Sequence, residues 1–290
     1  MLKIKYWFQL SRPQTLIASI SPVILGSAFC YKHTHFFELN IFFATLIAAI
    51  LIQILTNIIN DLYDWKKGAD TPNRLGPDRM VAKGFLKQRE VLQAIKIIGI
   101  LTILIGFYLV FKGGWIILLI GLSSLMFAYL YTATSFSIAY NGYGEFFVFL
   151  YFGLIASIGT VFLQSAHFYY EALLIGCITG CLNVCLLVVN NLRDVKEDME
   201  ANKKTLIVRY GVFFGKIEFV IMIIAPYFFL YNLLTLLNLP FFMYSYIILG
   251  LFSVVLIFKI CNNRMFLINQ ALKFLTVYIF SFTLLLLLNF

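Results

Sequence analysis

The nine residues Asn190-Asn-Leu-Arg-Asp-Val-Lys-Glu-Asp198 decide how this chain is interpreted. They close one of the longest apolar runs in the sequence, and Asn190, Asp194 and Asp198 follow one another at intervals of four residues. On an α-helix this spacing places the three side chains on one face. The segment 57–64 closes an earlier apolar run in much the same way. Two acidic clusters at the ends of membrane-length helices suggest a divalent metal site.

The composition indicates a membrane protein. Of the 290 residues, 62% are hydrophobic and 12% are charged, whereas soluble proteins carry about 25% charged residues. Apolar runs long enough for a helix to span a bilayer recur along the whole chain. No linker-like segment divides them. We therefore predict an all-α fold, a single polytopic domain over residues 1–290 that forms one helical bundle with a central, lipid-accessible cavity.

The distribution of charge predicts the topology. We expect nine transmembrane helices, at 15–32, 39–60, 91–111, 114–132, 144–165, 171–190, 212–236, 241–260 and 270–290. With a cytoplasmic N-terminus, the inside segments are 1–14, 61–90, 133–143, 191–211 and 261–269. Of the 22 Lys and Arg residues, all but Lys32 and Lys112 then lie inside or within a turn or two of the inside. Cytoplasmic loops carry such an excess, so we expect the N-terminus inside and the C-terminus outside.

The same topology brings the two acidic clusters to one side of the membrane. The clusters follow the second and the sixth predicted helices. Both helices are even-numbered, so both end at the cytoplasmic face, where neighbouring helices could bring the clusters together. The histidines His33, His35 and His167 fall on the outside and make a weak metal site at best.

The chemistry of the clusters suits a metal–diphosphate complex. Carboxylates at a membrane boundary are costly to bury and need counter-charge. Asn and Asp oxygens are hard ligands for Mg²⁺, which keeps several waters and completes its shell with phosphate oxygens. Basic residues are interleaved with the acidic ones in the segments 64–79 and 193–209, where they could bind a polyphosphate. An isoprenoid diphosphate in the lipid phase would use such a site.

Two other interpretations remain open at this point. The Asn and Asp residues could cap helix ends while Lys and Arg anchor the loops at the membrane interface. The chain could also be an ion-coupled membrane transporter, since carboxylates within the membrane mark ion pathways. Transporters usually break helices near the middle of the bilayer, whereas these carboxylates lie at helix ends.

The residues quoted so far resemble the UbiA superfamily of intramembrane aromatic prenyltransferases, over most of the chain up to about Gly211. The first family motif is present as Asn60-Asp61-Leu-Tyr-Asp64, and the second as Asn190, Asp194 and Asp198. Further segments are similar to the branch that prenylates 1,4-dihydroxy-2-naphthoate in menaquinone biosynthesis: Arg12-Pro13, Lys67-Gly68-Ala-Asp70, Arg74-Leu-Gly-Pro77-Asp-Arg79, Tyr131-Thr132, Gly144-Glu145, Lys204-Thr205-Leu and Arg209-Tyr-Gly211.

This resemblance implies roles for individual residues. Asp64, Asp194 and Tyr131 would be catalytic, with Tyr131 near the aromatic acceptor or the allylic carbon. The implied ligands of Mg²⁺–diphosphate are Asn60, Asp64, Asn190, Asp194 and Asp198, with Asn57 and Asp61 as further candidates. The implied diphosphate-binding residues are Arg12, Lys67, Asp70, Arg74, Arg79, Arg193, Lys203 and Lys204.

The resemblance also implies a reaction and its partners. A polyprenyl group would pass from polyprenyl diphosphate to 1,4-dihydroxy-2-naphthoate with loss of CO₂, giving demethylmenaquinone. The implied cofactor is Mg²⁺. The protein would be surrounded by membrane lipid, and nucleic acid would not be a partner. The protein would lie in the cytoplasmic (inner) membrane of a bacterium, with its active site near the cytoplasmic face.

Four departures from the family pattern leave the acceptor open. Gly68 stands where the general motif has a third Asp, Ala133 and Thr134 replace glycines, and Asn202 replaces a Gly. Acceptors such as 4-hydroxybenzoate, a porphyrin-type ring or a sugar remain alternatives, and the length of the prenyl chain is not evident from the sequence.

Overall fold

The structure, a computed structural model, describes residues 2–70, 78–239, 243–262 and 265–290. Every regular element in these residues is a helix. The α-helices are α1 (Leu2–Leu10), α2 (Ile17–Phe29), α3 (Leu39–Lys66), α4 (Gln88–Leu130), α5 (Gly144–Phe149), α6 (Ala156–Ser165), α7 (Tyr170–Arg193), α8 (Val195–Glu200), α9 (Leu206–Tyr210), α10 (Val212–Leu236), α11 (Met243–Cys261) and α12 (Met265–Asn289). Short 3-10 turns lie at Pro13–Thr15 and Ala139–Asn141, and π-helical turns at Cys30–Thr34 and Leu150–Ile155.

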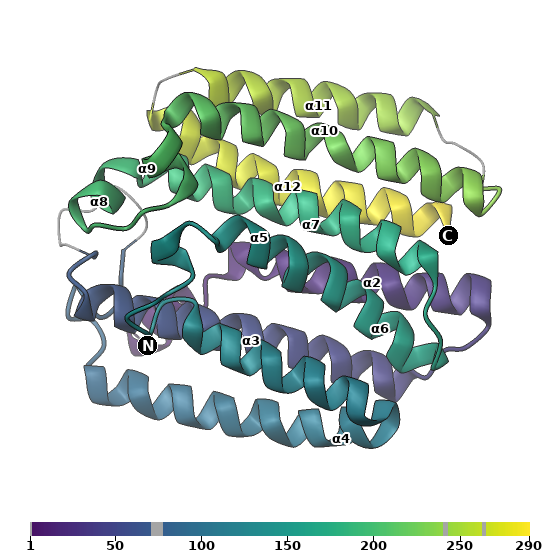
Figure 1. The fold of residues 1–290 in the computed structure, drawn as a ribbon, viewed down its shortest axis with the longest axis horizontal. Helices are drawn as coiled ribbons and strands as arrows, with labels where there is room; N and C mark the ends of the chain where they lie inside the picture. Colours follow the sequence, from purple (N-terminus) through teal and green to yellow (C-terminus); the bar gives the residue numbers. More distant parts are fainter. Residues whose placement is uncertain (1, 71–77, 240–242, 263–264) are drawn as a thin grey trace.

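The long helices form one bundle (Figure 1). Helices α7, α10, α11 and α12 pack together along one side, α3 and α4 pack along the other, and α2 and α6 connect the two groups. We call the end of the bundle where α3 and α7 finish the motif end. Helices α8 and α9 and the N-terminus lie at the motif end, and the C-terminus lies toward the opposite end (Figure 1).

Six helical segments are long and apolar enough to cross a membrane. The bent pair Lys3–Thr15 and Ile17–Thr34, which turns by 53°, makes a seventh if it counts as one span. The helix Tyr246–Cys261 is apolar but shorter. By length and composition, the described part of the chain thus offers six or seven candidate membrane-spanning segments, and the number nine stays a prediction. The six segments are Leu39–Lys66, Gln88–Leu130, Gly144–Ser165, Tyr170–Arg193, Val212–Leu236 and Phe266–Asn289.

Helix α4 covers two of the predicted spans. Its 43 residues would extend over about 65 Å as a straight helix, roughly twice the thickness of a bilayer core. The backbone leaves the helical region at Gly114 (φ 67°, ψ −155°). Near its middle, Lys112 pairs with Glu38 beside the start of α3 (2.8 Å). Beyond its last turn, Thr132 bonds Asn60 near the end of α3, so α4 doubles back at Gly114.

Helices α3 and α7 run further than the sequence predicts. The expected span 39–60 is part of Leu39–Lys66, and the expected span 171–190 is part of Tyr170–Arg193. Helix α3 ends where Gly68 takes a left-handed backbone conformation (φ 74°), which glycine adopts without strain. Asp61 and Asp64 therefore belong to the last turns of a helix and not to the following loop.

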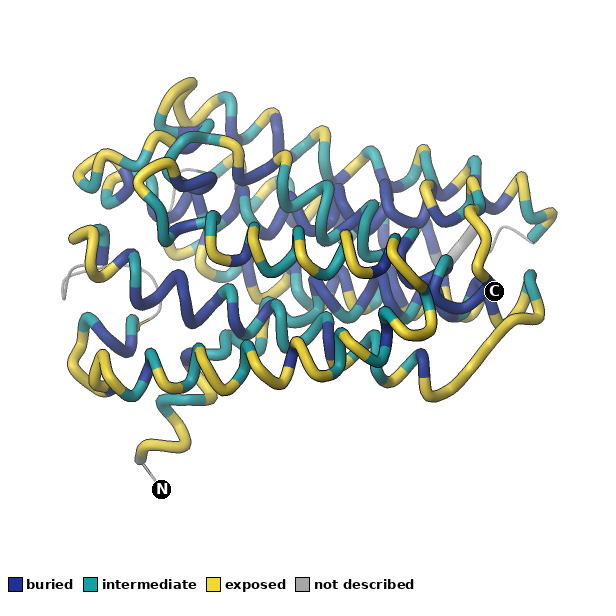
Figure 2. Tube along the Cα trace, turned by 60° about the horizontal axis from the view of Figure 1, so that its bottom comes forward, coloured by how far each residue is buried: buried dark blue, intermediate teal, exposed yellow. Residues whose placement is uncertain are grey.

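Helix α7 is the centre of the bundle. Its most apolar window is 89% buried, compared with 11% for that of α4, and buried residues gather in the interior of the trace (Figure 2). Close backbone contact makes this possible. A Cβ atom on Gly153 would lie 2.5 Å from the Cα atom of Gly180 and 2.6 Å from the carbonyl oxygen of Gly176. Small residues allow membrane helices to approach in this way.

We predict that Gly153→Val destabilises the protein by about 3 kcal/mol, because the added side chain must push two helices apart. The measurement is the thermal unfolding midpoint in detergent. Gly99→Val is the matched control, since nothing lies within 4 Å of a Cβ atom on Gly99. Equal midpoints for the two variants would show that the close approach does not support the bundle.

Candidate active site and adjoining cavity

Asn57 and Asp61, on the last turns of α3, fasten neighbouring segments to this helix. Asn57 donates a hydrogen bond from Nδ2 to the carbonyl oxygen of Ser11 (2.9 Å). The carboxylate of Asp61 accepts hydrogen bonds from the backbone N–H groups of Met80 (3.2 Å) and Val81 (3.1 Å). Both side chains are buried. Asn57 thus ties down the N-terminal segment, and Asp61 ties down the segment that leads into α4.

Asn60 and Asp64 lie on the same turns and contact the connection between α4 and α5. The side-chain oxygen of Asn60 accepts a hydrogen bond from the Thr132 hydroxyl (2.7 Å). Oδ1 of Asp64 accepts one from the Tyr140 hydroxyl (3.0 Å). Its Oδ2 lies 3.7 Å from a guanidinium nitrogen of Arg79.

Arg79 joins two carboxylates. Its Nε lies 3.1 Å from Oδ2 of Asp70, and Asp70 is buried. Arg12, with a left-handed backbone (φ 50°), begins the turn Pro13–Thr15, whose Thr15 hydroxyl accepts a hydrogen bond from Asn57. The predicted residue Arg74 lies outside the described residues.

The second cluster keeps its four-residue spacing across the end of α7. The backbone N–H of Asp194 donates to the carbonyl of Asn190 (3.0 Å), and that of Asp198 donates to the carbonyl of Asp194 (2.8 Å). This pattern continues the helical pitch from α7 into α8, although Asp194 itself (φ −95°, ψ 10°) joins the two helices. The one-face arrangement expected from the spacing is therefore present in the backbone.

Basic side chains neutralise this cluster. The guanidinium of Arg193 makes a two-pronged pair with the carboxylate of Asp194, at 2.5 and 2.8 Å. Lys203 donates to Oδ1 of Asp198 (3.1 Å). Oδ2 of Asp198 is buried and accepts no hydrogen bond from any described residue. Asn190 bonds the carbonyl of Leu186 on its own helix (2.8 Å).

Lys203 links the two clusters electrostatically. Burial lowers the pKa of this ammonium group, but Asp198, Asp64 and Asp194 outweigh burial and raise the pKa above its ordinary value. Burial raises the pKa of Asp198, while Lys203 opposes this shift. Because Asp64 lies on α3 and the other two carboxylates follow α7, one cation interacts with both halves of the predicted site.

Tyr140 is a residue of this site that the sequence interpretation missed. Its hydroxyl donates to Asp64, and the Nζ atoms of Lys67 and Lys203 lie 4.2 and 5.7 Å from the centre of its ring. The expected inside segment 133–143 contains no charged residue, so nothing in its sequence pointed to a role. Lys204 approaches the same residue through its backbone N–H, which donates to the carbonyl oxygen of Tyr140 (2.9 Å).

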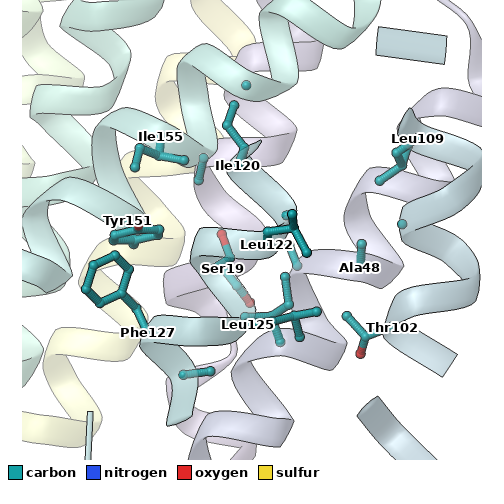
Figure 3. Close-up of a pocket in the computed structure, with 18 of the residues that line it drawn as sticks. Ser19, Ala48, Thr102, Leu109, Ile120, Leu122, Leu125, Phe127, Tyr151 and Ile155 are labelled. Carbon is teal, nitrogen blue, oxygen red and sulfur yellow. The ribbon is translucent and has the colours of Figure 1, made fainter. Parts of the chain in front are cut away.

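An apolar cavity of about 260 Å³ adjoins the site and extends between α2, α3, α4 and α6. Tyr131 and Ile138 belong to its lining, and both lie in the connection between α4 and α5 whose Thr132 and Tyr140 bond Asn60 and Asp64. Figure 3 shows Phe127 and Tyr151 on one wall and Ala48 on another. The lining consists mainly of aliphatic and aromatic side chains, with a few hydroxyls such as those of Ser19, Thr102 and Thr160.

The donor groups fit a metal that binds together with a ligand. Among the residues that the structure describes, no three His, Cys, Asp or Glu side chains form a metal site by themselves. The carboxylates instead pair with Arg79, Arg193 and Lys203. The available oxygens are nevertheless hard ligands, and Oδ2 of Asp198 is buried without a partner in the described residues. Mg²⁺ suits such a set because waters and phosphate oxygens usually complete its shell.

Comparison with known proteins identifies the family. The model of the UbiA prenyltransferase family matches residues 19–288. The chain belongs to the UbiA prenyltransferase family. The predicted resemblance is thereby confirmed, and with it the class of enzyme, a prenyltransferase located in the membrane through several long apolar helices.

Several relatives of this UbiA-family chain carry the name 1,4-dihydroxy-2-naphthoate octaprenyltransferase. The one from Bacillus subtilis is 34% identical over 205 residues, which make up 70% of this chain and 65% of the relative. The one from Escherichia coli is 37% identical over 215 residues, 71% of this chain and 68% of the relative. The matched region thus spans about two thirds of each relative.

The fold of this UbiA-family chain also matches a solved structure. A UbiA homologue from Archaeoglobus fulgidus bound to GPP and Mg²⁺ superposes with a TM-score of 0.65 at 14% identity. The match covers 97% of this chain and 99% of the homologue. At this identity the comparison establishes the common helical fold.

We predict that Asp61→Ala destabilises the protein, because two buried backbone N–H groups lose their acceptor. Each such group costs about 1–3 kcal/mol, so the thermal unfolding midpoint in detergent should fall by several degrees. Asp78→Ala is the control, since the Asp78 carboxylate is largely exposed and lies 3.5 Å from Lys83. The anchoring role of Asp61 is wrong if both variants unfold at the wild-type temperature.

Proposed function

We propose that this chain transfers a polyprenyl group from polyprenyl diphosphate to 1,4-dihydroxy-2-naphthoate, with Mg²⁺ and loss of CO₂, to give the reduced (naphthalenediol) form of demethylmenaquinone. One observation carries the proposal above the others. Tyr140 contacts both Asp64 on α3 and Lys203, the partner of Asp198 beyond α7, and the loop that carries Tyr140 also lines an apolar cavity. A diphosphate with an isoprenoid tail has the two chemistries that such a site would bind.

Mg²⁺ and diphosphate would be held at the motif end. When bound, Mg²⁺ would stabilise the charge that develops on the departing diphosphate. Lys67, Arg79, Arg193 and Lys203, which contact the loop or the carboxylates of this region, would bind phosphate oxygens, and we propose the same for Lys204. The homologue from Archaeoglobus fulgidus was solved with GPP and Mg²⁺, which supports this ligand pair. The proposed oxygen ligands of the metal are Asn60, Asp64, Asn190, Asp194 and Asp198.

The exchange of bonds that we propose is balanced without another reactant. The allylic carbon–oxygen bond breaks, and its electron pair leaves with the diphosphate. The allylic carbon then bonds to the ring carbon that carries the carboxylate, and CO₂ leaves with restoration of the aromatic ring. Tyr131, in the cavity lining next to the motif end, would face the reacting carbons, and aromatic rings such as Phe127 would stabilise the allylic cation.

We also propose nine membrane spans, with the N-terminus and the active site at the cytoplasmic face of the inner membrane and the C-terminus outside. The doubling back of α4 supports two spans within one element. The N-terminus lies at the motif end and the C-terminus toward the opposite end (Figure 1). The concentration of Lys and Arg in the segments of the motif end favours the cytoplasm.

The names of the relatives support the naphthoate as acceptor. 4-Hydroxybenzoate is the alternative within the family. An ion-coupled transporter finds less support, because α3 and α7 are continuous over a membrane-spanning length and carry their carboxylates at one end.

We predict that the purified protein releases CO₂ and diphosphate when supplied with Mg²⁺, a polyprenyl diphosphate and 1,4-dihydroxy-2-naphthoate. Asp64→Ala and Asp194→Ala should each reduce turnover at least a thousandfold, since each removes a proposed ligand of the metal–diphosphate complex. Circular dichroism in detergent checks that both variants remain helical. Full activity in both variants would contradict the assignment of the metal ligands. If the wild type turns over 4-hydroxybenzoate and not the naphthoate, 4-hydroxybenzoate is the acceptor.

We further predict that Ala48→Phe selects against long prenyl chains. Ala48 is buried and lines the cavity, so a phenyl ring there would fill space that a long isoprenoid needs. The ratio of kcat/KM for a long-chain to a short-chain diphosphate should fall at least tenfold. Ile47→Phe is the control because Ile47 is exposed on the same helix. An unchanged ratio in Ala48→Phe would show that the prenyl chain does not bind in this cavity.

A further inference from the structure

We propose that Tyr140 is a positioning residue that holds two diphosphate-binding lysines with its ring and one proposed metal ligand with its hydroxyl. This inference rests on the proposed function and extends it to a residue outside both family motifs. Tyr140 lies between the two halves of the site, in the 3-10 turn Ala139–Asn141.

The ring of Tyr140 faces two ammonium groups from different parts of the chain. The Nζ atom of Lys67, just beyond α3, lies 4.2 Å from the ring centre, and that of Lys203, after α8, lies 5.7 Å away. The face of an aromatic ring attracts cations at such distances. Long lysine side chains lose much conformational entropy when they are fixed. If the Tyr140 ring already holds both ammonium groups in place, less entropy is lost when they bind phosphate.

Lys67 is fixed further by the same loop. Its ammonium donates to the carbonyl oxygen of Thr134 (2.7 Å) and to the hydroxyl of Ser137 (2.9 Å). An ammonium has three donors, and these bonds to described residues occupy two of them. The loop thus aims Lys67 while leaving it able to bind an anion.

The hydroxyl of Tyr140 has a separate task. It donates to Oδ1 of Asp64 at 3.0 Å, while Arg79 lies beside Oδ2 of the same carboxylate. The two contacts fix the plane of the carboxylate from both of its oxygens. Removal of the hydroxyl frees one side of Asp64 without disturbing the ring that faces the lysines.

The backbone around Tyr140 does not depend on its side chain. The Lys204 N–H donates to the Tyr140 carbonyl, and Arg209 donates to the carbonyl oxygens of Asn141 (2.9 Å) and Lys204 (3.1 Å). Gly142 has φ 72°, and a Cβ atom there would lie 2.8 Å from the Lys204 carbonyl oxygen. These contacts hold the loop against the segment after α8, so a change of the Tyr140 side chain should leave the fold intact.

The experiment compares Tyr140→Leu and Tyr140→Phe with the wild type in detergent. Calorimetric titration with inorganic diphosphate in the presence of Mg²⁺ measures anion binding without turnover, and steady-state assays give KM for both substrates and the Mg²⁺ concentration for half-maximal rate. Tyr140→Leu should weaken diphosphate binding about tenfold and leave KM for the naphthoate within a factor of two. At saturating Mg²⁺, Tyr140→Phe should bind diphosphate like the wild type, but it should require about threefold more Mg²⁺ for the half-maximal rate.

Tyr143→Leu is the matched control, because Tyr143 lies in the same loop, is exposed and contacts Phe136 instead of the site. The inference is overturned if folded Tyr140→Leu binds diphosphate like the wild type, or if Tyr143→Leu weakens binding equally. Should Tyr140→Leu fail to fold, an unchanged Mg²⁺ requirement in Tyr140→Phe overturns it instead. A wild-type protein that neither binds diphosphate nor releases CO₂ would refute the proposed function itself.

Discussion

A buried carboxylate needs a positive partner, and this constraint shapes the motif end of the bundle. Asp64, Asp70, Asp194 and Asp198 are all buried there. Removal of such a charge from water is costly unless a counter-ion stands close by. Arg79, Arg193 and Lys203 provide that charge. The ionic contacts therefore hold the segments after α3 and α7 against the helix ends.

The same contacts explain why the described carboxylates do not form a complete metal cage. Each one is already shared with a basic side chain, so a divalent ion alone would have to compete with fixed cations. A Mg²⁺ ion that arrives with diphosphate changes the balance, because the phosphate oxygens attract the basic side chains and share the metal with the carboxylates. Because the metal neutralises the carboxylates and the diphosphate neutralises the basic side chains, the binding of each ligand depends on the other.

Local patterns in the sequence were sufficient for much of this architecture. The interval of four residues in 190–198 survives in the backbone across the α7–α8 junction, and the even numbering of two predicted helices correctly placed both clusters at one end. The exact ends of α3 and α7 were missed because polar residues that bind other segments can extend a helix beyond its apolar run. Tyr140 was missed because its role comes from contacts with Asp64, Lys67 and Lys203, which are distant in sequence. The sequence of an uncharged loop gives no indication of such contacts.

The most direct test concerns the proposed clamp, the metal–diphosphate site that Asp64 on α3 and Asp194 at the end of α7 would share. Mn²⁺ replaces Mg²⁺, and electron paramagnetic resonance follows its binding. Titrations of the wild type and of the double variant Asp64→Ala/Asp194→Ala, each with and without inorganic diphosphate, separate metal binding from catalysis. The structure predicts that the wild type binds Mn²⁺ tightly only with diphosphate, and that the double variant does not. Tight binding without diphosphate, or equal binding by the double variant, would contradict a clamp shared between α3 and α7.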